Sequence, residues 1–255
     1  VSGVASVAGI LNVSLVNGFR PNVGDTFRII ASNGETGNFT TINSSGFTVR
    51  SDVSPSGVVL TVTAVTLPPP VVLTSLVSRK THGGSTVLDL PLPLSGNVGV
   101  ESRAGGTTIE HLLIFTFATP LASTGGATIT AGTGIVYGEG IGSDPHQYIV
   151  SLTGVNNAQK LTVSLTNVSD TSGNYSPAVV TSVGFLLGDA NGDGTVNSAD
   201  VTFVRNHSGQ FADGTNLSAD FNLDGAVNSA DVITARAQSG NSIPLGAGVV
   251  TDGMR

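Results

Sequence analysis

Two twelve-residue stretches near the end of the chain carry oxygen-bearing side chains at regular spacing. Residues 189–200 read Asp-Ala-Asn-Gly-Asp-Gly-Thr-Val-Asn-Ser-Ala-Asp, and residues 220–231 repeat the pattern at an offset of 220 − 189 = 31. Ca²⁺ takes roughly six to eight oxygen ligands, and such a loop offers positions 1, 3, 5, 7, 9 and 12, with glycine at position 6 for the sharp turn. The repeat therefore predicts a duplicated unit with two calcium sites.

The predicted calcium ligands are the residues at those six positions of each loop: Asp189, Asn191, Asp193, Thr195, Asn197 and Asp200, and Asp220, Asn222, Asp224, Ala226, Asn228 and Asp231. At position 7 the ligand would be a main-chain carbonyl, so Ala226 is acceptable there, and the position 9 asparagines could act through water. Position 12 is Asp instead of Glu, one methylene shorter. We therefore expect affinities no tighter than those of sensor sites, on the order of 10⁻⁷–10⁻⁴ M.

The alternative is that these stretches are Asx-rich turns that bind no metal. Two near-identical copies at a fixed offset favour calcium. A structural role for the ions is expected in preference to a regulatory sensor role. Residues 183–187 read as a strand and 213–219 as a loop. Each loop is therefore followed by a helix but not preceded by one, which makes two half EF-hands.

At residues 188–243 the sequence resembles the type I dockerin family, whose calcium loops read Asp-x-Asn-x-Asp-Gly-x-Val-Asn-Ser-x-Asp. The resemblance implies a small two-calcium module with pseudo-twofold symmetry that docks onto a cohesin partner, in either of two orientations. By position, the residues that would face the partner are Ser198, Ala199, Arg205, Ser229, Ala230 and Arg236. The alternative is that the Ser-Ala pairs simply begin helices, since Ser suits helix starts and Ala favours helix.

The rest of the chain reads as β-structure. Alternating apolar and polar residues predict strands at 11–16, 26–29, 47–50 and 59–65, and then at 71–77, 86–90, 111–117, 127–130, 148–153, 161–165 and 179–187. We predict a mainly β protein with a small α C-terminal module. Its parts are a small all-β domain (1–67), a proline linker (68–70), an immunoglobulin-like antiparallel β-sandwich (71–187), the calcium module (188–243) and a tail (244–255).

Two further resemblances are less specific. Residues 11–19, 24–30 and 37–39 look like the closing repeat of secreted β-solenoid passenger domains. The stretch 78–83, followed by a sandwich and a dockerin-like tail, looks like modular surface proteins of environmental bacteria. Both favour a secreted bacterial protein at the cell surface or in the extracellular matrix.

Composition excludes several functions. The net charge is −7, with only 10 Lys and Arg in 255 residues, which argues against nucleic-acid binding. No apolar run is long enough to insert into a membrane. The chain has no Cys, hence no thiol chemistry, and no Trp. A flat, aromatic sugar-binding face is therefore disfavoured, although carbohydrate contact is not excluded.

No catalytic arrangement is evident. Glu101 and Glu110 are the nearest approach to a glycosidase pair, and nothing in the sequence places them face to face. His82, His111 and His146 lack metal-binding spacing. Arg79, Lys80, His82 and Arg103 could form a basic patch, and solvated surface charges are the simpler interpretation. We predict that the protein is not an enzyme.

The sequence leaves two functions open. One is a non-catalytic extracellular structural or adhesive protein, in which calcium stabilises a docking or assembly module. In this function it could assemble head to tail with copies of itself, through apolar segments at 1–10 and 245–251. The alternative is an anchoring fragment of a polysaccharide-degrading complex that binds a cohesin through its dockerin-like module.

Overall fold

The computed structural model describes residues 5–16, 19–32, 34–105 and 111–243. The chain divides into two units, Val1–Pro69 and Pro70–Arg255, and the division falls within the proline run. The predicted tail 244–255 and Glu110 lie outside the described residues. The finer division of the second unit at residues 187 and 188 stays a prediction.

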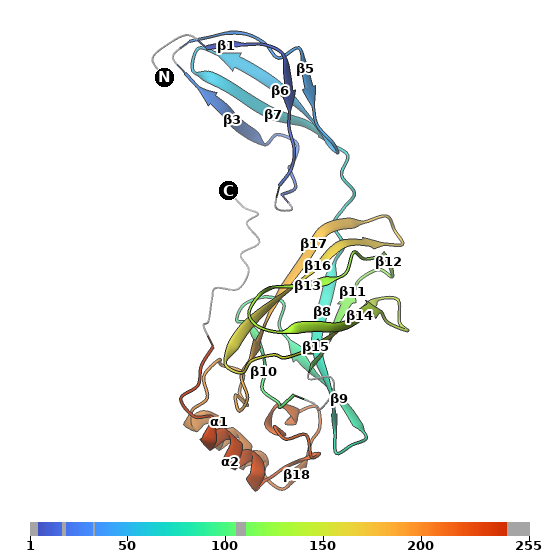
Figure 1. Cartoon of the computed structure of the whole chain (residues 1–255), viewed down its shortest axis with the longest axis vertical. Helices are drawn as coiled ribbons and strands as arrows, with labels where there is room; N and C mark the ends of the chain where they lie inside the picture. Colours follow the sequence, from blue (N-terminus) through green and yellow to red (C-terminus); the bar gives the residue numbers. More distant parts are fainter. Residues whose placement is uncertain (1–4, 17–18, 33, 106–110, 244–255) are drawn as a thin grey trace. The chain divides into compact units, whose positions relative to one another are not determined.

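The first unit contains short parallel pairs and one antiparallel sheet (Figure 1). Its strands are β1 (Ala5–Val7), β2 (Ile10–Asn12), β3 (Thr26–Ala31), β4 (Glu35–Gly37), β5 (Thr41–Asn43), β6 (Phe47–Ser54) and β7 (Gly57–Val65). β1 pairs with β4 and β2 with β5, both parallel, while β3, β7 and β6 form the antiparallel sheet. The predicted strand 11–16 is wrong in its length. Its partner β5 has only three residues, so the ladder ends after the bond from Val13 N to Asn43 O (2.8 Å).

The second unit is built on two five-stranded sheets. One has the order β14-β15-β11-β8-β9; the other has the order β10-β17-β16-β12, with β13 also paired to β16. The strands are β8 (Leu73–His82), β9 (Thr86–Leu92), β10 (Gly99–Glu101), β11 (His111–Phe117), β12 (Leu121–Ser123), β13 (Ala127–Ala131), β14 (Ile135–Ile141), β15 (Gln147–Thr153), β16 (Gln159–Asp170) and β17 (Tyr175–Phe185). All pairings are antiparallel except that of β10 with β17.

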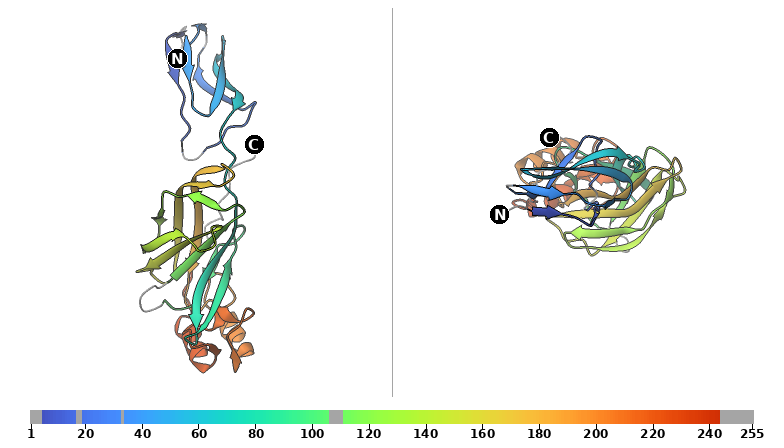
Figure 2. Two further views of the ribbon diagram at one scale, coloured as in Figure 1. Left: turned by 90° about the vertical axis from the view of Figure 1, so that its right-hand side faces the viewer. Right: turned by 90° about the horizontal axis from the view of Figure 1, so that it is seen from above.

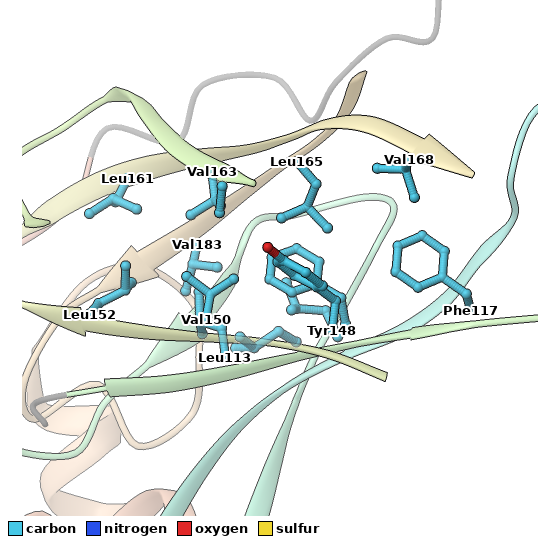
Figure 3. Packing of buried hydrophobic residues seen from close by; sticks show 14 of the residues in the cluster. Leu113, Phe117, Tyr148, Val150, Leu152, Leu161, Val163, Leu165, Val168 and Val183 are labelled. Carbon is cyan, nitrogen blue, oxygen red and sulfur yellow. The ribbon is translucent and has the colours of Figure 1, made fainter. Parts of the chain in front are cut away.

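The two sheets enclose one apolar core, so the second unit contains the predicted β-sandwich. Burial alternates along β15 and along much of β16, as expected for strands with one face against a core. Figure 3 shows Leu161, Val163 and Leu165 of β16 facing Leu113, Val150 and Leu152 of the opposite sheet, and all six are 0% exposed. We call β8–β17 the sandwich.

The sequence did not predict β14 as a strand. Its glycines, Gly138 and Gly140, lower β-propensity, and its alternate residues Ile135 (63% exposed) and Tyr137 (66%) face solvent. β14 forms because its main chain pairs with β15 from Ile135–Thr153 to Ile141–Tyr148. Residues 135–141 therefore form a strand because their main chain pairs with β15, and their own side chains do not favour it.

Residues 188–243, called the helical module here, lie at the end of the sandwich to which β8 and β9 run (Figures 1 and 2). The module contains α1 (Ser198–His207), β18 (Gln210–Phe211), η1 (Leu217–Ala219), β19 (Ala226–Val227) and α2 (Ser229–Ala237). It has its own small core around Val204, Phe221 and Ala235. A second cluster joins it to the sandwich: Val100 and Leu186 pack with Val196 and Ile243. In the described ranges no helix is long and apolar enough to cross a membrane.

Charged side chains are buried where the sandwich meets the helical module. Arg103 (2% exposed) forms a bidentate ion pair with Glu101 (1%), with Nε–Oε1 at 2.8 Å and Nη2–Oε2 at 2.7 Å. Lys80 (6% exposed) donates from Nζ to Ala104 O at 2.7 Å. The surface interpretation of the basic residues is therefore wrong for Lys80, His82 and Arg103, and only Arg79 is half exposed, paired with Asp89 at 2.7 Å. A short-range pattern cannot reveal that the module covers them.

The electrostatics of this cluster follow from its burial. Burial alone would raise the pKa of Glu101, but the charge and hydrogen bonds of Arg103 and the charge of Lys80 lower it to about 2. Burial and the charge of Lys80 lower the pKa of His111 to about 3. His111 is therefore neutral in the folded protein at neutral pH, and its ring packs edge-on against Phe185.

We predict that Leu165→Ala destabilises the sandwich by about 2–5 kcal/mol, because it leaves a cavity between the sheets. The measurement is urea unfolding followed by tyrosine fluorescence, which reports the second unit because all three tyrosines (Tyr137, Tyr148 and Tyr175) lie there. The matched control is Leu94→Ala, since Leu94 is 44% exposed and should cost under about 1 kcal/mol. Equal effects of the two substitutions would contradict the assigned core.

We predict that His111 makes the fold less stable in acid. In the unfolded chain this histidine has its ordinary pKa of 6.5, but in the fold its pKa is about 3, so the unfolded state binds more protons between these values. Stability should therefore fall as the pH drops below about 6.5, by up to about 3 kcal/mol at pH 4.5 from this group. His111→Leu should lose less stability than the wild type between pH 7 and pH 4.5. Equal losses of stability in the two proteins would contradict this role of His111.

Candidate metal centre

Each helix of the module begins with the same cap. The side chain of Asn197 accepts from Ala199 N at 2.7 Å, and the side chain of Asp200 accepts from Asn197 N at 2.8 Å. Asn228 and Asp231 repeat both bonds at 2.8 and 2.9 Å. This reciprocal arrangement satisfies main-chain donors at a helix start. Positions 9 and 12 of each loop therefore fix where its helix begins. The helices begin at Ser198 and Ser229, as the alternative interpretation of the Ser-Ala pairs expects, and the Asn before each Ser is the capping residue.

Side chains at positions 3 and 5 fold each loop back on itself. Asn191 Oδ1 accepts from Asp193 N at 2.9 Å, and Asp193 Oδ1 accepts from Thr195 N at 2.9 Å. The second loop has the same two bonds, from Asp224 N to Asn222 and from Ala226 N to Asp224, at 3.0 and 2.9 Å. These short-range bonds curl the main chain, which also passes through positive φ at Gly194 (86°) and Gly225 (91°).

The first and last carboxylates of each loop are buried. Asp189 accepts main-chain N–H groups from Gly192, Asp193 and Gly194 at 2.8–3.2 Å. Asp200 joins the two ends of its loop by accepting from Asn191 N (3.2 Å) as well as from Asn197 N. Asp189, Asp200, Asp220 and Asp231 are 0–1% exposed, whereas Asp193 and Asp224 face solvent.

Burial leaves negative charge that the first loop does not neutralise. Desolvation, with the nearby charges of Asp200 and Asp193, raises the pKa of Asp189 to about 6 even though main-chain donors oppose the shift. The pKa of Asp231 is raised for the same reason, by burial and by the charge of Asp220. Buried carboxylates are normally paired with a cation or coordinated to a metal. The donor set therefore fits a hard divalent cation.

The acidic side chains do not suffice by themselves. Within the described ranges, no three His, Asp or Glu side chains converge closely enough to hold a metal. Binding would therefore depend on the amide oxygens of Asn191, Asn197 and their counterparts, and on the main-chain carbonyls at Thr195 and Ala226. Calcium uses carbonyl oxygens readily, while zinc would favour His or Cys, so the chemistry of the donors fits calcium.

The two halves of the module exchange main-chain bonds in a symmetric way. Gly209 N, after α1, donates to Val227 O in the second loop at 2.8 Å, and Gly240 N, after α2, donates to Val196 O in the first loop at 2.8 Å. The donors, like the acceptors, are 31 residues apart. The predicted partner-facing residues all lie on the outside of this pair and are exposed: Ser198, Ala199, Arg205, Ser229, Ala230 and Arg236.

One contact of the second loop was absent from the sequence interpretation. His82, at the end of β8, lies 2.7 Å from Asp220, with Nδ1 facing Oδ2, and both side chains are fully buried. The residues are 138 positions apart, so no local pattern pairs them. The sequence pattern favoured a solvated surface position for His82, and the structure places it beneath the module instead.

Comparison with known families agrees with this geometry. Residues 187–234, which are 234 − 187 + 1 = 48 of the 255 residues, match the family model described as the dockerin type I domain. Comparisons with curated proteins and with solved structures gave no match. The family match confirms the resemblance seen in the loops: the C-terminal part of this chain contains a dockerin type I domain.

Proposed function

We propose that the helical module binds two calcium ions, one per loop, through the twelve residues predicted from the spacing. The support is the duplicated loop itself: both copies fold with the same caps, the same turn bonds and buried carboxylates at positions 1 and 12. Calcium would supply the positive charge that balances these buried carboxylates. No residue of the chain other than those of the loops is needed as a direct ligand.

The loaded module docks onto a cohesin-type partner. Dockerin type I domains are calcium-dependent modules that bind cohesins, and residues 187–234 match that family. Both Ser-Ala pairs, Ser198-Ala199 and Ser229-Ala230, are exposed at helix starts, so each half of the pseudo-symmetric module offers a contact surface. Equivalent surfaces would allow binding in two orientations.

The rest of the chain is carried to the partner as a non-catalytic structural or adhesive part. Lys80, Glu101 and Arg103 are buried in ion pairs and main-chain bonds. The Glu101 carboxylate is held by Arg103 instead of facing a second carboxylate, which argues against a glycosidase role for it. Such a protein would act outside the cell, at a surface or in a matrix, where millimolar calcium keeps the module loaded.

We predict that the full chain binds a type I cohesin in 2 mM calcium and loses this binding in excess chelator. Ala199→Glu and Ala230→Glu each disturb one surface without harming helix starts, where acidic residues are favourable. Each single variant should keep affinity within about threefold, and the double variant should lose at least about 100-fold. Biolayer interferometry against a panel of cohesins measures this. Ala118→Glu, on the exposed sandwich surface, is the matched control.

Two results would contradict the docking proposal. One is that no cohesin in the panel binds the calcium-loaded chain. The other is that the Ala118→Glu control weakens binding as much as the double variant, since the helix starts would then not be the contact surface.

A second candidate function is self-association, and the exposed edge of the sandwich favours it. β14 is the last strand of its sheet and presents Ile135, Tyr137 and Ile141 (41% exposed). Open apolar edges pair readily with other strands. The segments first considered for this role are less suitable: β1 and β2 are already paired inside the first unit, and 245–251 lies outside the described residues.

Self-association predicts a calcium-independent oligomer that a charged edge breaks. Light scattering after size exclusion should give a mass above 25.5 kDa in both calcium and chelator, and Tyr137→Lys should return the mass to that of one chain. Assemblies that dissolve in chelator would point to the calcium module instead. A single chain in both buffers would remove this candidate and leave docking.

A further inference from the structure

A buried row of four side chains connects the sandwich to the second loop. Glu101 holds Arg103 by two bonds, Arg103 Nη1 lies 3.0 Å from His82 Nε2, and His82 Nδ1 lies 2.7 Å from Asp220 Oδ2. All four are 0–2% exposed. Asp220 is position 1 of the loop, so the row ends on a predicted calcium ligand.

The bond from Arg103 determines which ring nitrogen of His82 carries the proton. A guanidinium has five N–H donors and no acceptor, so Nε2 of His82 must accept the bond from Arg103. The proton of the neutral ring is then on Nδ1, and Nδ1–H donates to Asp220. Glu101 pairs with Arg103, and the row ends in an N–H donor to Asp220.

The main chain around this row is also joined to the second loop. Gly83 N donates to Leu223 O at 2.9 Å, and Ala104 N donates to Phe221 O at 2.8 Å. The backbones are so close that a Cβ on Gly225 would lie 2.9 Å from Gly83 Cα. The turn after β8 and the segment after β10 therefore hold the loop at Leu223 and Phe221, directly after Asp220.

The first loop is also joined to the sandwich, through Gly188 N to Ser102 O at 3.0 Å, but its position 1 aspartate has no counterpart of the His82 bond among the described residues. In the described part of the chain, the hydrogen bonds to Asp189 all come from main-chain N–H groups of its own loop, at Gly192, Asp193 and Gly194. Asp220 keeps the matching bonds from Asp224 N (3.2 Å) and Gly225 N (2.9 Å) and adds the histidine. Two loops of nearly identical sequence therefore sit in different surroundings.

We propose that His82 is a positioning residue for the second calcium loop, so that this loop binds calcium more tightly than the first and its calcium holds the module on the sandwich. The inference rests on the proposed calcium binding. A carboxylate already held by a buried donor loses less rotational freedom when it ligates a metal, and outer hydrogen-bond partners typically change metal affinity about 10–100-fold. Such coupling is reciprocal. If the contact with the sandwich raises the calcium affinity of the second loop, calcium binding must strengthen that contact by the same free energy.

The experiment isolates one loop at a time in the full chain. In the Asp193→Ala background only the second loop binds, and calcium is titrated by calorimetry. His82→Leu, which removes the donor, should weaken binding about 10–100-fold. His82→Asn places an amide N–H near the former Nδ1–H and should recover most of that loss. In the mirror-image Asp224→Ala background, where only the first loop binds, His82→Leu should change affinity less than about threefold.

A second measurement needs no change at His82. Amide hydrogen exchange at Gly83 and Ala104 reports the main-chain bonds to the second loop. Removing calcium should speed their exchange in the Asp193→Ala chain, whose second loop is intact. In the Asp224→Ala chain, where that loop is disabled, calcium should make no difference. This arm holds even if His82→Leu fails to fold.

The outcomes separate the two proposals. If the wild type takes up no calcium, the proposed function fails and this inference fails with it. If the wild type binds two ions but His82→Leu weakens both loops alike or neither, or His82→Asn recovers nothing, only the role of His82 is overturned. Exchange at Gly83 and Ala104 that ignores calcium in the Asp193→Ala chain overturns the coupling.

Discussion

Burying a carboxylate is costly unless something replaces the water it loses, and the helical module is organised around four such groups. In each loop the position 1 and position 12 aspartates are inaccessible to solvent, and each is surrounded by main-chain N–H groups. The same bonds form the loop, close it and start the following helix. Loop shape, helix start and charge distribution are thus consequences of one requirement, that buried carboxylate oxygens find hydrogen-bond donors. In the proposed function, a bound cation supplies the remaining charge compensation.

The duplicated halves meet a sandwich that has no such symmetry. Between themselves the halves exchange matching bonds, through Gly209 to Val227 and Gly240 to Val196. Against the sandwich they differ: the first loop contributes Val196 to an apolar cluster with Leu186, while the second places Asp220 on His82. The sandwich therefore gives two loops of nearly identical sequence different surroundings, and both helix starts stay exposed.

Short-range sequence patterns predicted the structure correctly where short-range interactions determine it. The alternation of residues 147–153 and 159–170 matches strands with one face on the core, and the loop spacing matches a chain whose side chains bond two or three residues away. Patterns failed where the partner is distant. β14 exists through pairing with β15, and His82 is buried against Asp220, which lies 138 residues later in the chain.

By itself, the sequence determined the ligand spacing, the duplicated loop-helix units, the family of the C-terminal domain and the mainly β character of the rest. Those properties depend on residue types a few positions apart, because helix caps, Asx turns and strand alternation are short-range. Only the tertiary structure decided that the module packs against the sandwich, and that Arg103, by donating to His82, directs a proton toward Asp220. That arrangement requires four side chains from three distant parts of the chain (His82, Glu101 with Arg103, and Asp220) to be buried together, and no short-range sequence pattern predicts that.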